Sequence, residues 1–202
     1  TVVYMIGNAT SRLLQLLLLP IITGLLLTTE YGYYDLVIST ISLVLPLFTL
    51  QLVEALFKYL FKINESEKGI IVSTAVVFLF LGTALFAAFI FIVNKFTGVI
   101  QYPTLIFFHY STFTAMAFYQ KITRSLQKTT SFAISGVMHT FILICTQLLF
   151  LLVLNMRVEG LLAANVIANL SCVVYLEIVT HARNMVSLRN VRFDTLRQLL
   201  RF

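Results

Sequence analysis

The first long apolar segment carries three polar side chains that could contact a ligand inside a membrane. Asn8, Arg12 and Gln15 fall on one face of a helix at 100° per residue. An arginine at mid-membrane costs about 2.5 to 3.5 kcal/mol, so Arg12 either snorkels to the membrane surface or faces a hydrated cavity. In a cavity, its guanidinium would attract an anionic group such as a phosphate more strongly than in water.

A second polar stripe lies at the end of the next apolar segment and consists of Gln51, Glu54 and Lys58. Antiparallel pairing of the first two helices would bring Glu54 to a depth similar to that of Arg12. We therefore predict that Arg12 and Glu54 approach each other or line the same cytoplasmic mouth. An ordinary interfacial position is the alternative for Glu54.

Three later segments also contain polar side chains that are costly in hydrocarbon unless they meet partners or water. They either form hydrogen bonds between helices or line a substrate path. His139 shares a helical stripe with Ser135 and Thr146, while Asn165 and Asn169 share one with Cys172. The complete set of predicted substrate-binding residues is Asn8, Arg12, Gln15, Gln51, Glu54, His109, His139, Asn165 and Asn169.

Catalytic and metal chemistry have little support in the sequence. Ser135 and His139 are one helical turn apart, a spacing that packing also produces, and no glycine-rich oxyanion motif accompanies them. The histidines are dispersed, and Cys145 and Cys172 have no metal-ligand or CxxC spacing. We expect no enzyme activity and no cofactor, and we leave open whether H⁺ or Na⁺ acts as a coupling ion.

The elements that must hold these residues are membrane-spanning helices. Of the 202 residues, 59% are apolar and 11% charged, which nearly excludes a soluble enzyme. Residues 69–94, 96–120 and 129–156 carry no charge and exceed the roughly 20 residues needed to cross a bilayer as a helix. Their continuous apolar runs do not alternate as barrel strands do. We predict an all-α integral membrane bundle of six helices at about 4–27, 34–57, 69–93, 102–120, 131–154 and 160–181.

The loop charges predict the orientation of this bundle. Among the loop and tail cations, only Lys95 and Arg157 fall outside the second connection, the fourth connection and the C-terminal tail. The positive-inside rule places these basic segments and both termini in the cytoplasm, with residues 183–202 as a basic amphipathic linker. The net charge of +6 then faces anionic lipid headgroups, so no nucleic-acid partner is expected. Four tyrosines are expected to form an aromatic belt at the external ends: Tyr31, Tyr33, Tyr34 and Tyr102.

Residues 9–62 contain a series of short motifs. A Thr-Ser-Arg12 start is followed by Leu-Pro20-Ile-Ile-Thr23, the turn Glu30-Tyr31-Gly32, Pro46-Leu, and Glu54-Ala-Leu-Phe-Lys58. This pattern resembles the N-terminal part of the oligosaccharide flippases, the Wzx-like polysaccharide exporters, within the multidrug/oligosaccharidyl-lipid/polysaccharide superfamily. The motifs cover about the first 60 residues, and the rest of the chain agrees in helix count.

The resemblance implies one lobe of a two-lobe transporter in the bacterial cytoplasmic membrane. Such a protein moves a polyprenyl-diphosphate-linked oligosaccharide to the outer leaflet by alternating access, in polysaccharide biosynthesis, and the C-terminal lobe is absent from this chain. A cation-coupled multidrug exporter of the same superfamily is the alternative, and it would require a carboxylate deep in the membrane. A membrane-embedded enzyme of glycan assembly would need a clustered set of acidic or nucleophilic residues on one membrane face, which the short loops do not supply. A pure scaffold would have no hydrated cavity between the first two helices.

Overall fold

The structure is a computed structural model that describes residue 16, residues 18–60 and residues 65–186. This part of the chain is helical and contains no strand, which confirms the prediction of an all-α protein. A helix over residues 18–25 comes first. The elements that follow are α2 (Thr28–Thr49), α3 (Leu52–Leu60), α4 (Glu65–Thr97), α5 (Pro103–Ser125), α6 (Thr129–Leu148), a π-helical turn η1 (Leu149–Val153), α7 (Val158–Thr180) and a 3-10 turn η2 (Ala182–Met185).

Four segments of the described chain are long and apolar enough to cross a membrane. They are Thr28–Thr49, Lys68–Thr97, Thr129–Val153 and Val158–Thr180. Helix α5 has 23 residues and is therefore long enough, but it carries several polar side chains and is not among the four. These helices indicate a membrane-embedded protein, because their exposed side chains are mostly apolar.

The predicted helix at 34–57 is wrong in one respect, because the structure divides it into two helices. Helix α2 begins earlier, at Thr28, and ends at Thr49, and both Leu50 and Gln51 adopt positive φ angles, 49° and 55°. Pro46 cannot donate a backbone hydrogen bond within α2, and its carbonyl accepts the N–H of Gln51 at 3.1 Å. The chain therefore turns sharply before α3, and Gln51 lies exposed in this turn.

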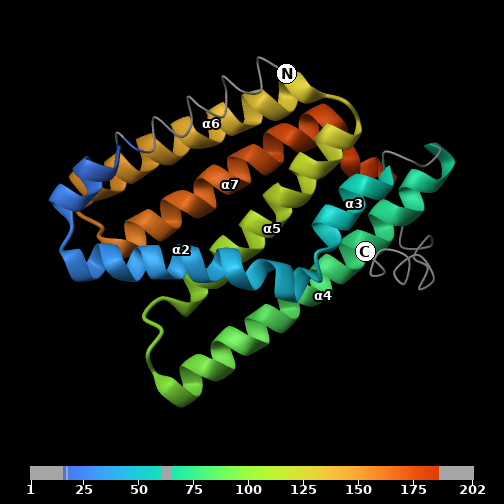
Figure 1. Cartoon of the computed structure of the whole chain (residues 1–202). Helices are drawn as coiled ribbons and strands as arrows, with labels where there is room; N and C mark the ends of the chain where they lie inside the picture. Colours follow the sequence, from blue (N-terminus) through green and yellow to red (C-terminus); the bar gives the residue numbers. More distant parts are fainter. Residues whose placement is uncertain (1–15, 17, 61–64, 187–202) are drawn as a thin grey trace.

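Helix α7 lies at the centre of the bundle and packs between α5 and α6 (Figure 1). Small and medium side chains on α7 are completely buried against these neighbours, among them Ala164, Ala168, Cys172 and Leu176. Helix α2 crosses α4 and α5, where Phe86 and Tyr110 stack with ring centroids 3.9 Å apart. The helix at residues 18–25 packs on α6 and α7 through three leucine and isoleucine side chains, Leu18, Ile22 and Leu26.

The described parts of the basic connections lie together at one end of the bundle, which we call the basic end. Lys128, just before α6, donates from Nζ to the carbonyl of Val179 near the end of α7, at 2.7 Å. Ser73 near the start of α4 donates from Oγ to the carbonyl of Met185 in η2, at 3.4 Å. The ends of α3, α5 and α7 and the starts of α4 and α6 therefore meet at the basic end.

Candidate functional site

Three of the predicted substrate-binding residues, Asn8, Arg12 and Gln15, lie outside the described residues. The predicted approach of Arg12 to Glu54 therefore stays a prediction. The structure instead gives Glu54 a different partner. Lys121 of α5 contacts both carboxylate oxygens of Glu54 with its Nζ atom, each at 2.7 Å.

The pair of Lys121 and Glu54 belongs to a cationic site on α3 and α5 at the basic end. The ring of Phe57, one turn after Glu54, has Nζ of Lys121 5.5 Å from its centroid and Cζ of Arg124 4.7 Å from it. A second ring, that of Phe132 at the start of α6, lies 5.3 Å from the Arg124 guanidinium carbon. All three distances are within the range in which aromatic faces attract cations. Two positive charges are thus held next to each other over one ring.

The Lys121 and Glu54 side chains differ in exposure, which matters for binding. The side chain of Lys121 is 19% exposed, whereas that of Glu54 is 60% exposed. An ion pair with one well-hydrated partner contributes little to stability, so a stronger anion can displace the carboxylate. A phosphate group carries more negative charge than a carboxylate and accepts more hydrogen bonds. The geometry therefore allows a phosphate group to take the place of the Glu54 carboxylate next to Lys121 and Arg124.

A polar network lies deeper in the bundle and joins α5, α6 and α7. Nε2 of His139 lies 2.9 Å from Oδ1 of Asn169. Nδ2 of the same amide lies 3.4 Å from Nδ1 of His109 and donates to Oγ1 of Thr112 at 3.3 Å. The structure thus brings together three of the predicted site residues, and we call His109, Thr112, His139 and Asn169 the polar network. Thr112 of this network lies about 14 Å along α5 from Lys121, at a rise of 1.5 Å per residue.

A second polar group surrounds Tyr34 of α2. Asn165, one turn before Asn169 on α7, donates from Nδ2 to the phenol oxygen at 2.8 Å, and Gln147 of α6 donates to it at 3.3 Å. The expectation that Tyr34 belongs to an interfacial belt is therefore wrong. Its hydroxyl points into the bundle because two amides there need an acceptor. By contrast, Tyr33 stays at the surface and accepts the backbone N–H of Gln101 at 3.1 Å.

Ser135 and His139, although one turn apart, do not bond to each other. The hydroxyl of Ser135 donates to the carbonyl of Phe132 at 2.7 Å, and His139 is engaged by Asn169. A nucleophile needs its base within hydrogen-bond reach, and this arrangement does not provide one. Among the described residues, no group of three or more His, Cys, Asp or Glu side chains could hold a metal ion.

An apolar crevice of about 640 Å³ lies along α4 and α5 and reaches the basic end at Glu177 and Arg183. Three serine and threonine hydroxyls also line it, and each donates to a carbonyl of its own helix: Thr83, Ser111 and Thr114. The crevice therefore offers an incoming molecule mainly hydrocarbon surface along its length. Its apolar lining includes Val76, Leu79, Phe80, Phe107, Phe108 and Phe118.

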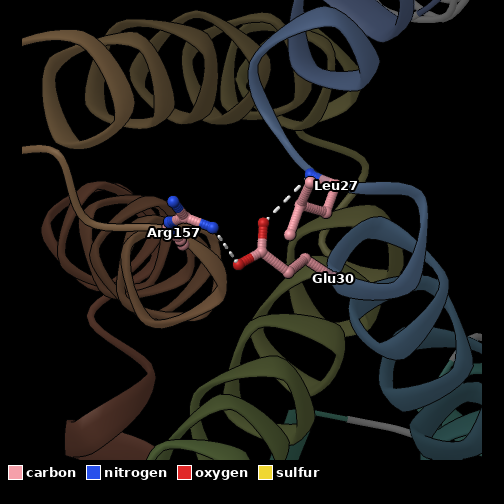
Figure 2. A network of polar contacts seen from close by, with 3 residues as sticks. All are labelled: Leu27, Glu30 and Arg157. Carbon is pink, nitrogen blue, oxygen red and sulfur yellow. Dashed lines mark hydrogen bonds and ion pairs between the residues drawn. The ribbon is translucent and has the colours of Figure 1, made fainter.

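At the opposite end, α2 is joined to the connection between η1 and α7. Figure 2 shows Glu30 between the backbone of Leu27 and the side chain of Arg157. One carboxylate oxygen accepts the N–H of Leu27 at 3.0 Å, and the other accepts Nη1 of Arg157 at 2.7 Å. The hydrogen bond to Glu30 raises the pKa of Arg157, which therefore stays charged. Glu30 thus caps α2 and also links it to the α7 side of the bundle.

This double role predicts different effects for the two partners. Glu30→Ala removes both the cap and the ion pair, whereas Arg157→Ala removes only an exposed ion pair. We expect Glu30→Ala to lower the midpoint of thermal unfolding clearly and Arg157→Ala to lower it slightly. The double variant should match Glu30→Ala, and equal effects of the two single changes would contradict the assignment of a cap.

A comparison with known protein families, characterised proteins and solved structures finds no match for this chain.

Proposed function

We propose that this chain is a six-helix lobe of a transporter that flips a polyprenyl-diphosphate-linked oligosaccharide across the bacterial cytoplasmic membrane. In this proposal the first helix and α5 complete the six crossings, and the basic end and both termini face the cytoplasm. A second, C-terminal lobe would complete the cavity. The reaction is movement between leaflets by alternating access, so the protein makes or breaks no covalent bond.

The cationic site carries this proposal. A lipid-linked diphosphate arrives from the cytoplasm with several negative charges, and Lys121 and Arg124 are two cations over one ring at the basic end. In the partly water-excluded environment of Lys121, whose side chain is 19% exposed, attraction between charges is stronger than in bulk water. The site therefore suits the first contact with the diphosphate.

Two further features of the bundle match the sugar and the hydrocarbon chain of such a substrate. The amides and imidazoles of Asn165, Asn169, His109 and His139 can exchange their present hydrogen bonds for those of sugar hydroxyls. The apolar crevice along α4 and α5 suits an isoprenoid chain, because its lining is almost entirely hydrocarbon. A diphosphate, a sugar and a hydrocarbon chain would thus each meet matching chemistry.

A binding measurement tests this proposal. Polyprenyl diphosphate, polyprenyl monophosphate and neutral polyprenol are titrated against the protein in nanodiscs and followed by native mass spectrometry. We expect the diphosphate to bind at least about tenfold more tightly than the polyprenol, which corresponds to about 1.4 kcal/mol. The double change Lys121→Ala, Arg124→Ala should remove this preference, while Lys95→Ala at the opposite end should preserve it. Equal binding of all three lipids would contradict the proposal.

A further inference from the structure

A single amide joins two histidines from different helices, and the direction of its bonds defines their tautomers. Oδ1 of Asn169 can only accept, so His139 donates to it from Nε2 at 2.9 Å. The amide nitrogen can only donate, so Nδ1 of His109, 3.4 Å away, is an acceptor. His109 is then neutral with its proton on Nε2, and neutral His139 likewise carries its proton on Nε2.

The two histidines respond differently to an added proton. On His109 the new N–H would face the amide N–H₂ of Asn169, placing two donors against each other. On His139 the proton goes to Nδ1, which no described residue bonds, and the bond from Nε2 to Asn169 is kept. That bond also becomes charge-assisted and roughly twice as strong. We propose that the His109, Asn169 and His139 cluster is a proton-binding site, with His139 as the residue that takes up the proton.

Burial distinguishes the histidines in the same way. His109 is 4% exposed and stacks on Phe113, with ring centroids 5.9 Å apart. His139 is only half-buried. A proton therefore reaches His139 more readily, and its charge is less costly there than at His109. His109 acts as the acceptor that orients the amide.

Among the described residues, the tyrosine and cysteine side chains on the neighbouring helices form no hydrogen bond with either histidine. Tyr34 of α2 accepts from Asn165, and the thiol of Cys172 on α7 contacts a carbonyl of α6. Tyr110 of α5 stacks on Phe86 of α4, and its buried hydroxyl has no hydrogen-bond partner among the described residues.

Charged groups lie toward the basic end. Glu177 is about 12 Å along α7 from Asn169, and Lys128 is about 16 Å along α6 from His139, by the helical rise. Within the described part of the chain, no carboxylate or cation forms an ion pair or a hydrogen bond with the polar network. The first charge in this region of the described bundle would therefore be that of His139 itself.

The ligand in this proposal is a proton. Sodium prefers a shell of oxygen ligands, whereas this cluster presents imidazole nitrogens and one amide oxygen that His139 already occupies. The proton would become the coupling ion if the proposed transport function holds. Proton binding itself does not depend on the transported molecule, so the experiment below contains none and its failure would leave the transport proposal standing.

The chain has three histidines, so each can be followed separately. His181 lies exposed at the end of α7, and His181→Gln leaves only the two in question. The full chain with ¹⁵N-labelled histidine is placed in lipid bilayers and titrated by solid-state NMR. We expect two Nε2–H tautomers at neutral pH, and on acidification the conversion of His139 alone to imidazolium. His139→Gln should abolish proton uptake in this background.

Two changes at Asn169 then give opposite shifts. Asn169→Leu removes the acceptor of a charge-assisted hydrogen bond, so the midpoint of His139 should fall by about 1 to 2 pH units. Asn169→Asp has nearly the same shape and adds a negative charge, so the midpoint should rise. If the leucine variant does not fold, the aspartate variant decides alone. Protonation of His109 before His139, an Nδ1–H tautomer of His139 at neutral pH, or an unchanged midpoint in Asn169→Asp would each overturn the proposal.

Discussion

Replacing Gly82 with alanine is expected to destabilise the bundle strongly, and replacing it with leucine should prevent folding. A Cβ atom at Gly82 of α4 would clash with the carbonyl oxygen of Phe48 and lie 3.1 Å from its carbon. The obstacle is backbone near the end of α2, immediately before the turn at Leu50, so it cannot rotate away. Overpacking typically costs about 1 to 3 kcal/mol, which here exceeds the helix-propensity gain of up to about 1 kcal/mol from alanine.

Gly136 of α6 provides the matched control, since no atom lies within 4 Å of the Cβ position there. Gly136→Ala should be neutral or slightly stabilising. Unfolding by heat or denaturing detergent, followed by circular dichroism in lipid or mild detergent, measures both variants. If Gly82→Ala were as stable as Gly136→Ala, the close crossing of α2 over α4 would be refuted.

Replacing Lys121 with glutamate should reduce transport by about 100-fold or more, which corresponds to about 2.7 kcal/mol. The change replaces attraction of the diphosphate by repulsion and sets a second carboxylate next to Glu54. The initial rate of glycolipid movement in proteoliposomes, divided by the amount of folded protein, is the quantity to compare. Lys95→Glu changes the net charge equally at the opposite end and should leave that rate nearly unchanged.

Glu54→Gln separates a substrate role of Lys121 from a structural one. This variant breaks the same ion pair but leaves the Lys121 cation available to phosphate. We expect transport at or near the normal rate, together with tighter binding of polyprenyl diphosphate. A loss as large as that of Lys121→Glu would show that the ion pair itself, rather than the cation, is required.

The charge-free stretches of the sequence predicted where the helices lie, but they did not predict where a helix is interrupted. Apolar length locates a membrane helix because charges are costly in hydrocarbon, which is why α4, α6 and α7 fall near the predicted ranges. A proline inside a helix favours a local interruption, but the chain turns four and five residues after Pro46, at Leu50 and Gln51. Neither leucine nor glutamine favours a positive φ, so these residue types did not mark the turn in the sequence.

Helical periodicity predicted which polar side chains share a helix face, but not which side chains they contact. Helical periodicity placed Asn165 and Asn169 on one face of α7, and the structure confirms that both point into the bundle. Which side chains meet them depends on how neighbouring helices rotate and cross, and one sequence carries no direct signal of this. The contacts of Tyr34 with Asn165 and of Lys121 with Glu54 were therefore not predicted.

The most direct test of the proposed function follows a fluorescent polyprenyl-diphosphate oligosaccharide between the leaflets of vesicles that contain the complete transporter. A membrane-impermeant quencher reports how much of the glycolipid remains in the inner leaflet over time. The account predicts movement many times faster than in protein-free vesicles, with loss of this rate in Lys121→Glu and little movement of a neutral polyprenol of equal length. The account would be contradicted if vesicles with and without the protein gave equal rates and the Lys121→Glu change left the rate unaltered.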